Sequence, residues 1–548
     1  MDMPSQGKVG EILREFDYLA GKRGIWEKHW EEVALKVLPY YSTSFYSQGN
    51  MTAGAKRNQE QYDVTANTAL WRFGAAMESM LTPATGRWHR LRASDPALMQ
   101  DKQVQIWFDQ VNDLLFHYRY APQANFQSQQ HDGYISIGAF GTSCLFVDAL
   151  SGQSGIRYRH IPLGELFFAC NHQGIVDKVY RRYKMTIRQI AQQWGEDKLP
   201  EALTTKLETK PEEEVMVVHA VIPNDDYSAG KMNHKGMPFY SCYILKDYKI
   251  TIGEGGYKSF PYAIARYITA PNELYGRSPA MNVLPSINVL NEEKKTIIKQ
   301  GHRIVDPVLL AHDDGILDGF SLRPGAMNYG AVSADGRPLV HALPTGNLSI
   351  GKELMDDERQ AINDAFLVTL FQILVDTPQM TATEVMERAR EKGALLSPTM
   401  GRFQSESIGP MIIREFDLLA QQHLLPPMPQ ALLDAGSSYK VEYDAPLNRA
   451  MKSESAAGIM RTAQWAGEIA AQTQDPSAMD WFDWDIIIPE LADINGAPFR
   501  FIRGKDVVDQ LRQGRKQAAA GQQLTQALPG IASLTKSLHP SGMVGGGG

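Results

Sequence analysis

The stretches SINVLNEEKKTIIKQG (residues 286–301) and KELMDDERQAINDAFLVTLFQILV (residues 352–375) decide the fold of this chain. Both are predicted helices. In the first, the apolar side chains recur at the spacing of one helical face: Val283, Ile287, Leu290 and Ile297. The second is charged in its first half and almost wholly apolar from Ala365. We therefore expect one end of it to stand in water and the other to be buried on all sides.

The segment between these helices, residues 307–345, is predicted to form a small module of strands and turns. The short apolar runs PVLLA and PLVHAL are typical of strands. Turn signals break up the segment at Asp314-Gly315, Arg323-Pro324-Gly325, Asn328-Tyr329-Gly330 and Asp335-Gly336. The chain is therefore expected to leave a larger body along one helix, build a small module and return along the other helix.

The rest of the chain has the alternation of an α+β protein. Helical patterns precede a region of strands at 155–268, which one helix interrupts at 187–194, and helical patterns follow it again. The predicted helices outside the central pair cover residues 8–38, 65–81, 97–119, 381–392, 403–425, 446–471 and 505–523. A single strand is predicted at 439–443, and the Gly-rich tail is expected to be disordered.

Composition narrows the class of protein. The chain has 548 residues, of which 43% are hydrophobic, and a formal net charge of −7. That length predicts roughly three or four structural units. A protein that binds nucleic acid tightly usually has a strongly basic face, and the overall charge gives no such signal.

Cysteine usage and hydropathy favour synthesis in a reducing compartment, away from the membrane. Cys144, Cys170 and Cys242 are far apart in sequence and are predicted to be buried free thiols. The polar N-terminus has no signal-peptide pattern. The longest apolar run, residues 365–375, is shorter than the roughly 20 residues that a membrane span needs.

One motif resembles a nucleotide-binding loop. Residues 346–352, GNLSIGK, match G-x-x-x-x-G-K and follow an apolar run. A phosphate loop then needs Ser or Thr to place a hydroxyl on Mg²⁺, but this chain has Glu353. We therefore interpret the match as a coincidence, and a P-loop-like ATPase that uses Gly346–Lys352 is kept only as an alternative.

Other candidate sites have simpler interpretations. The aspartates at 313, 314 and 318, and those at 480, 483 and 485, have the chemistry of a divalent-metal site, but turns and helix N-termini explain both groups. The basic run RWHRLR at 87–92 is interpreted as a strand with solvated charges rather than a nucleic-acid patch. With no His-x-x-His spacing and no Gly-x-Ser-x-Gly motif, we predict no catalysis, cofactor or metal.

Several stretches together resemble the portal, or head-to-tail connector, proteins of short-tailed phages (podoviruses). They lie in the family's order and cover most of the chain, the part after about Ala450 least clearly. The stretches are WEKHWEEVALKVLP (26–39), YDVTANTALWRFGAAMESMLTPATGRWHRL (62–91), NFQSQQHDGYISIGAFGTSCLFVD (125–148), LYGRSPAMNVLPSINVLNEEKKTIIKQGHRIVDP (274–307) and TATEVMERAREKGALLSPTMGRFQSESIGPMIIREFDL (381–418).

The resemblance implies a portal fold that assembles as a dodecameric ring around an axial channel. It implies a stem of two helices with a small β-containing clip between them, an α+β wing and a helical crown. The corresponding residues are 1–278 and 403–449 for the wing, 279–303 and 351–375 for the stem, 304–350 for the clip, 376–402 for a tunnel loop or valve, 450–530 for the crown and 531–548 for the tail.

The same resemblance implies function and partners. Such a ring sits at one capsid vertex of the virion, is synthesised in the host cytoplasm, and conducts double-stranded DNA during packaging and ejection. Its partners are the other copies, the major capsid and scaffolding proteins, the terminase large subunit and the tail adaptor or tube proteins. A net negative charge fits a channel that does not bind DNA tightly, because each phosphate neutralised by a cation would add affinity. A scaffold or adaptor without a channel is the remaining alternative.

Particular side chains follow from this interpretation. Candidates to centre DNA are Lys295, Lys299 and Arg303 on the first helix and Arg388, Arg390 and Lys392 near the tunnel loop. Candidates for the valve are Leu395, Leu396 and Pro398. Candidates for docking at the clip are Asp313, Asp314, Asp318, Arg323 and Arg337.

Overall fold

The computed structural model describes residues 6–42, 44–45, 54–231, 233–311, 320–344, 348–369, 400–436, 439–444, 446–494 and 501–518. The chain divides into two compact units. The first unit consists of Met1–Trp88 and Leu115–Leu425, and the second of His89–Leu114 and Pro426–Gly548. The chain thus visits the second unit early, returns to the first for most of its length, and ends in the second.

A five-stranded antiparallel sheet forms one part of the first unit, in the order β4-β5-β6-β7-β8. Its strands are β4 (Leu166–Cys170), β5 (Val176–Thr186), β6 (Glu214–Pro223), β7 (Phe239–Leu245) and β8 (Ile250–Tyr257). Since side chains alternate between the faces of a strand, Val218 and Ala220 of β6 face helix α1 (Gln6–Val37), where they meet Phe16. On the other face, Val215 and Val217 pack with helices α5 (Ile187–Trp194) and α6 (Glu201–Thr209).

A three-stranded sheet lies in the same unit, in the order β3-β2-β9. Its strands are β2 (Thr142–Ala149), β3 (Ile156–His160) and β9 (Tyr262–Arg266). Helix α4 (Phe126–Phe140) packs on helix α2 (Thr65–Leu81) so closely that a Cβ at Gly138 would lie 2.5 Å from Leu70 Cδ1. This contact requires glycine unless the leucine moves. Short 3₁₀ helices connect the elements: η1 (Pro39–Tyr41), η3 (Pro122–Ala124), η4 (Leu163–Glu165), η5 (Glu196–Lys198) and η6 (His234–Gly236).

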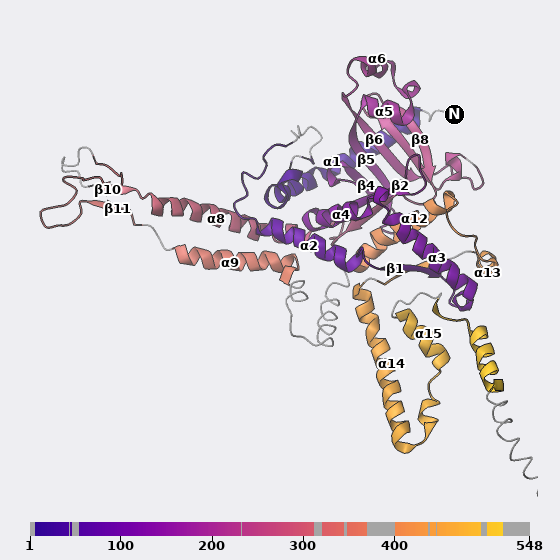
Figure 1. Ribbon diagram of the computed structural model, residues 1–548. Coiled ribbons are helices and arrows are strands. Elements are labelled where there is room, and N and C mark those ends of the chain that lie inside the picture. The colour runs from indigo at the N-terminus through magenta and orange to yellow at the C-terminus, as the bar shows by residue number, and fades with distance from the viewer. Residues whose placement is uncertain are drawn as a thin grey trace, which may run out of the picture. The chain divides into compact units, whose positions relative to one another are not determined.

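Two paired helices, which we call the arm together with the strands at their tip, extend from this body (Figure 1). The chain enters through α7 (Pro279–Asn282) and α8 (Leu284–Val305), forms the antiparallel strands β10 (Leu309–Ala311) and β11 (Val340–Ala342), and returns along α9 (Leu348–Ala365). The predicted turns at Gly325, Gly330 and Gly336 are present, and all three glycines have positive φ. The predicted order of helix, strand module and helix is therefore confirmed.

The predicted unbroken helix to Val375 is wrong. Helix α9 ends at Ala365, and Leu367 has a φ of 60°, in the left-handed region that an α-helix cannot contain. The apolar end is described only as far as Thr369, where Phe366 and Val368 are buried but Ala365 and Leu367 are half-buried and Thr369 is exposed, so this part is not buried on all sides as expected. The chain reappears at Met400 in a helix that contains a π-helical segment, η7 (Gln404–Ile408), and continues as α12 (Gly409–Gln421).

The second unit joins an early strand and helix to the C-terminal elements. Strand β1 (His89–Ala93) pairs antiparallel with β12 (Tyr439–Tyr443). No local pattern in the sequence around β1 reveals so distant a partner. The other elements are η2 (Leu98–Gln100), α3 (Lys102–Arg119, whose last residues belong to the first unit), α13 (Gln430–Asp434), α14 (Pro446–Thr473), η8 (Pro476–Met479), α15 (Trp484–Ile494) and a helix at 505–518.

Candidate functional surfaces

The two helices of the arm are held together by an apolar seam. Ile287 and Leu290 of α8 are buried, as are Met355 and Ile362 of α9. Nearer the tip, Gly351 lies so close to α8 that a Cβ there would be 2.9 Å from Ile297 Cδ1. The predicted apolar face of the first helix is thus the face that carries the contact.

A polar segment that precedes α2 fastens both helices at their base. Asn291 of α8 accepts a hydrogen bond from the Tyr62 backbone N–H at 2.7 Å and donates one to the Glu60 carbonyl at 2.7 Å. On α9, the Arg359 guanidinium pairs with Asp63 at 2.8 Å. Burial alone would raise the pKa of Asp63, but hydrogen bonds from Thr65 and Arg359 outweigh it, so the pKa lies below its ordinary value. The carboxylate therefore stays charged and keeps the helix fastened.

The three basic side chains predicted on α8 differ in their surroundings. Lys295 is half-buried, contacts Glu292 at 3.2 Å and lies over the Tyr62 ring at 5.6 Å. Lys299 and Arg303 are exposed, and neither has an ion-pair partner among the described residues. Of the three predicted side chains, these two are therefore available to an external anion.

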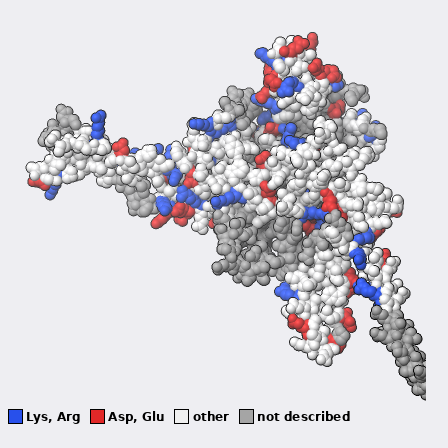
Figure 2. All heavy atoms as spheres, viewed as in Figure 1, with Lys and Arg blue, Asp and Glu red and all other residues white. Residues whose placement is uncertain are grey.

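Acidic side chains lie on the arm as well, so its surface carries both signs (Figure 2). Glu293 of α8 is close to Glu358 of α9, and partial burial followed by the repulsion of Glu358 raises the pKa of Glu293. A surface of mixed sign attracts a polyanion less than a purely basic one would.

The tip of the arm is exposed and contains apolar side chains. Leu322, Met327 and Tyr329 are 71%, 80% and 84% exposed. Arg323 and Arg337, both predicted to dock a partner, lie in exposed turns of this tip. The other predicted docking residues, Asp313, Asp314 and Asp318, fall outside the described residues.

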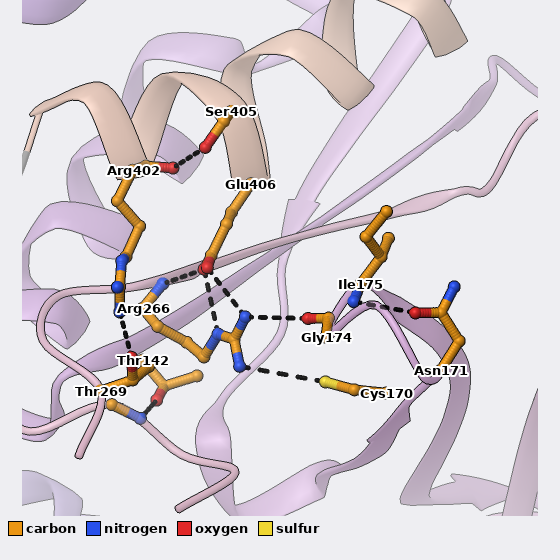
Figure 3. Close-up of polar contacts among 11 residues, drawn as sticks. Thr142, Cys170, Asn171, Gly174, Ile175, Arg266, Thr269, Arg402, Ser405 and Glu406 are labelled. Carbon is orange, nitrogen blue, oxygen red and sulfur yellow. Dashed lines mark hydrogen bonds and ion pairs between the residues drawn. The ribbon is translucent and has the colours of Figure 1, made fainter. Parts of the chain in front are cut away.

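The candidates of the predicted tunnel loop also fall outside the described residues: Arg388, Arg390, Lys392, Leu395, Leu396 and Pro398. The structure does describe how the chain is anchored after that segment (Figure 3). Glu406, in the π-helical segment, accepts hydrogen bonds from Arg266 Nε at 3.0 Å and from Arg266 Nη2 at 2.8 Å. The Arg266 backbone N–H donates to the same carboxylate at 3.2 Å.

Further contacts strengthen this anchor from the body. Arg266 also reaches the Gly174 carbonyl at 3.3 Å and Cys170 Sγ at 3.9 Å, and Arg402 donates to Thr269 (Figure 3). Burial alone would lower the pKa of Arg266, but its hydrogen bonds to Glu406 reverse the shift and raise it. A π-helical turn is a rare local geometry that often occurs at a functional position. Here the ion pair between Arg266 and Glu406 holds the π-helical segment on the body.

A buried ion pair holds the next turns of the same helix. Arg119 and Glu415 are both fully buried, with 3.0 Å between Arg119 Nε and Glu415 Oε1. Tyr158 Oη donates to the same oxygen at 2.7 Å. The pairs Arg119–Glu415 and Arg266–Glu406 could not be predicted from the sequence, because their members lie 296 and 140 residues apart and share no local motif.

The phosphate-loop alternative is not supported by the local structure. Helix α9 begins at Leu348, so residues 348–351 of the motif are helical and not a loop that wraps around a phosphate. Their backbone N–H groups lie in the first turn of a helix that packs on α8 through Gly351. An open Gly-rich loop with several converging N–H groups is what phosphate binding requires.

Several side chains of the remaining charged motifs make contacts within the fold. Asp485 pairs with Arg512 at 2.7 Å, and Asp483 accepts a hydrogen bond from the Asp485 backbone N–H at 3.0 Å. Arg90 and Arg92 of the basic run lie in β1, as predicted, but they pair with Asp444 and Glu442 instead of being solvated.

The cysteines are not paired with one another. Cys144 and Cys242 are buried free thiols, and Cys170 is free and half-buried. Over the described residues we find no group of side chains arranged to hold a metal ion and no helix long and apolar enough to cross a bilayer.

Comparison with known proteins gives consistent results over nearly the whole chain. A family model described as "Bacteriophage head to tail connecting protein" matches residues 9–502. The probable portal protein of Bordetella phage BPP-1 is 29% identical over 530 residues, which are 95% of this chain and 94% of that protein. The portal protein of Salmonella phage epsilon15 is 28% identical over 549 residues, which are 97% of this chain and 96% of that protein.

Proposed function

The chain belongs to the family of bacteriophage head to tail connecting proteins and serves as a portal, and we propose that twelve copies form a ring whose axial channel carries double-stranded DNA into and out of the capsid. The observation that carries this proposal is the similarity to two portal proteins over at least 94% of their lengths. The ring is a component of the virion, at one vertex of the capsid, and is made in the host cytoplasm.

Each part of the chain then has a role in the ring. The paired helices α8 and α9 are the stem, the β10–β11 tip is the clip, the sheets form the wing and α14 and α15 belong to the crown. Lys299 and Arg303 centre the DNA through brief contacts, which is consistent with their exposure and with the mixed charge of the arm. Residues 376–402 form a valve in the channel. If phage are made with a portal that lacks residues 394–399 and still retain full-length DNA, these residues are not a valve.

Electron microscopy of the purified chain tests the proposal most directly. We expect closed rings with a central hole wide enough for duplex DNA, and class averages with twelvefold symmetry. Particles that are rods, monomers or solid discs at the same concentration would contradict the channel and favour an adaptor.

The tip of the arm is expected to be dispensable for folding. Ala311 and Val340 are paired across the two strands, so an Asn-Gly turn can replace residues 312–339 and close a two-residue hairpin. We expect the variant to keep the melting temperature and the rings of the parent chain, because the apolar seam of the arm is intact. We expect it to lose terminase docking and tail attachment, measured by DNA packaging and by joining of tails to filled heads. Normal packaging and normal tail joining would show that the tip of the arm does not dock the terminase or the tail.

The purified ring is expected to have no ATPase activity of its own. The physical reason is that residues 348–351 are helical and that Glu353 occupies the position of the Mg²⁺-binding hydroxyl. Phosphate release should stay at background in Mg²⁺ and ATP, in the parent and in Lys352→Ala alike. Turnover that depends on Mg²⁺ and disappears in Lys352→Ala would instead support the enzyme alternative.

A further inference from the structure

A cavity of about 770 Å³ lies against the face of the five-stranded sheet on which α5 and α6 pack. On that face, odd-numbered residues of β5 and β6 point outward, and only part of them are covered by α5 and α6. The three-stranded sheet covers another part, where His219 bonds Tyr262 at 2.6 Å. The cavity is the space that remains between the helices α5 and α6 and the three-stranded sheet. Its volume is in the range of ligand-binding pockets.

Basic side chains exceed acidic ones in the lining of this cavity. The charged residues are Arg157, Arg159, Arg181 and Lys184 against Asp148 and Glu165. Both carboxylates already have a cation: Glu165 pairs with Arg181 at 2.8 Å, and Asp148 pairs with Arg414 at 3.1 Å. The acidic groups are therefore unable to neutralise the remaining arginines.

Two arginines of the lining are left over by this pairing. Arg157 and Arg159 are exposed and lie on one face of β3, because they are two residues apart. Arg157 donates to the Gln123 carbonyl at 2.7 Å and has no carboxylate partner among the described residues. Arg159 has no hydrogen-bond or ion-pair partner within the described parts of the chain. Guanidinium groups present forks of N–H donors that suit carboxylates.

The opposite wall offers groups that bond peptide backbones. Gln192 and Gln193 of α5 line the cavity, are exposed and have no partner among the described residues. An amide side chain donates and accepts, as a peptide group does. One wall thus has the chemistry to bind negative charge, and the other has the chemistry to bind an extended chain.

From these contacts we infer that the cavity is a docking site for an acidic protein segment, whose carboxylates pair with Arg157 and Arg159 and whose backbone meets Gln192 and Gln193. The site goes beyond the portal function and needs neither the channel nor a particular ring size. Nucleic acid fits it less well. The ring faces on which bases would stack are taken, since Tyr243 stacks on His219 at 4.0 Å and Arg181 lies over Tyr183 at 4.1 Å.

Fluorescence anisotropy with the full-length chain and labelled octaglutamate at about 150 mM salt tests this site. We expect saturable binding that weakens at least tenfold in the double variant Arg157→Gln/Arg159→Gln. The matched control is Arg188→Gln, at an exposed arginine of α5 that pairs with Glu212 outside the cavity, and it should change the Kd less than twofold. Octaglutamine should not bind, and octalysine should bind the double variant Arg157→Glu/Arg159→Glu better than the parent.

Three outcomes would overturn the inference. The first is no binding of octaglutamate to the parent chain at millimolar concentration. The second is equal weakening by Arg188→Gln, which would mean general electrostatic attraction. The third is tighter binding of a single-stranded oligonucleotide that the Arg157→Gln/Arg159→Gln variant loses, which would make the cavity a nucleic-acid site. Circular dichroism and ring formation of each variant check that the fold is intact.

Discussion

Replacement of Arg119 by Met is expected to lower the free energy of unfolding by about 3–5 kcal/mol, because it leaves a buried carboxylate without its cation. Glu415 is fully buried, and besides Arg119 its side chain accepts a hydrogen bond from Tyr158. The guanidinium also lies 4.6 Å from the Trp88 ring centroid and 4.8 Å from that of Phe116. Urea denaturation measures this loss of unfolding free energy as a shift of the unfolding transition of the first unit to lower urea concentration.

Two further variants separate the ion pair from simple loss of packing. The double variant Arg119→Met/Glu415→Leu removes both charges, so its loss should be clearly smaller than that of Arg119→Met alone. Arg188→Met breaks the exposed pair with Glu212 and should cost less than about 1 kcal/mol. If the double variant is at least as unstable as the single one, the unpaired carboxylate is not the cause.

Acid is expected to destabilise the body through two buried histidines. Burial lowers the pKa of His160 to about 4, and burial followed by the charge of Arg181 lowers that of His219 to about 3. The unfolded histidines titrate near 6.5, so the unfolded chain binds more protons below that pH and stability falls as the pH drops. The stability that the neutral rings contribute is fully present above pH 6.5. Each histidine is expected to cost about 2 kcal/mol between pH 7 and pH 5.

The histidine contribution is measurable as a difference between variants. His160→Gln should reduce the loss of unfolding free energy between pH 7 and pH 5 by about 2 kcal/mol, whatever its effect on stability at pH 7. His172→Gln, at an exposed histidine, should leave the loss as it is in the parent. An equal pH dependence in His160→Gln and the parent would show that this ring does not stay neutral in the fold.

Local patterns predicted local structure well. Residues 65–81, 187–194 and 439–443 are elements with the predicted bounds, because their periodicity and turn signals depend only on neighbouring residues. Helix α6 was missed, since EALTTKLET is polar and has a single fully buried anchor, Leu203. The end of α9 was also missed. Phe366, Leu367 and Val368 continue the apolar run of the helix, and nothing local announces the left-handed backbone at Leu367.

For the candidate sites too, local features were predictable from the sequence and tertiary contacts were not. Exposure of Lys299, Arg303, Arg323 and Arg337 was predictable from helical periodicity and turn chemistry. The pairing of Arg266 with Glu406 was not, because it depends on tertiary structure that brings β9 to the π-helical segment. The same is true of Arg90 and Arg92. The basic run in which they lie predicts charges in contact with water, but in the structure they pair with Asp444 and Glu442.

The pairing of β1 with β12 has a consequence for synthesis on the ribosome. Arg90 and Asp444, which bond across this sheet, are 354 residues apart. At about 5–20 residues per second, the ribosome needs roughly 20–70 s to make the partner strand after the first one has emerged. During that time β1 has an unpaired edge that another nascent chain of the same kind can occupy. Slower elongation or crowded polysomes should therefore increase aggregation of this chain, and a chaperone that covers residues 89–93 should reduce it.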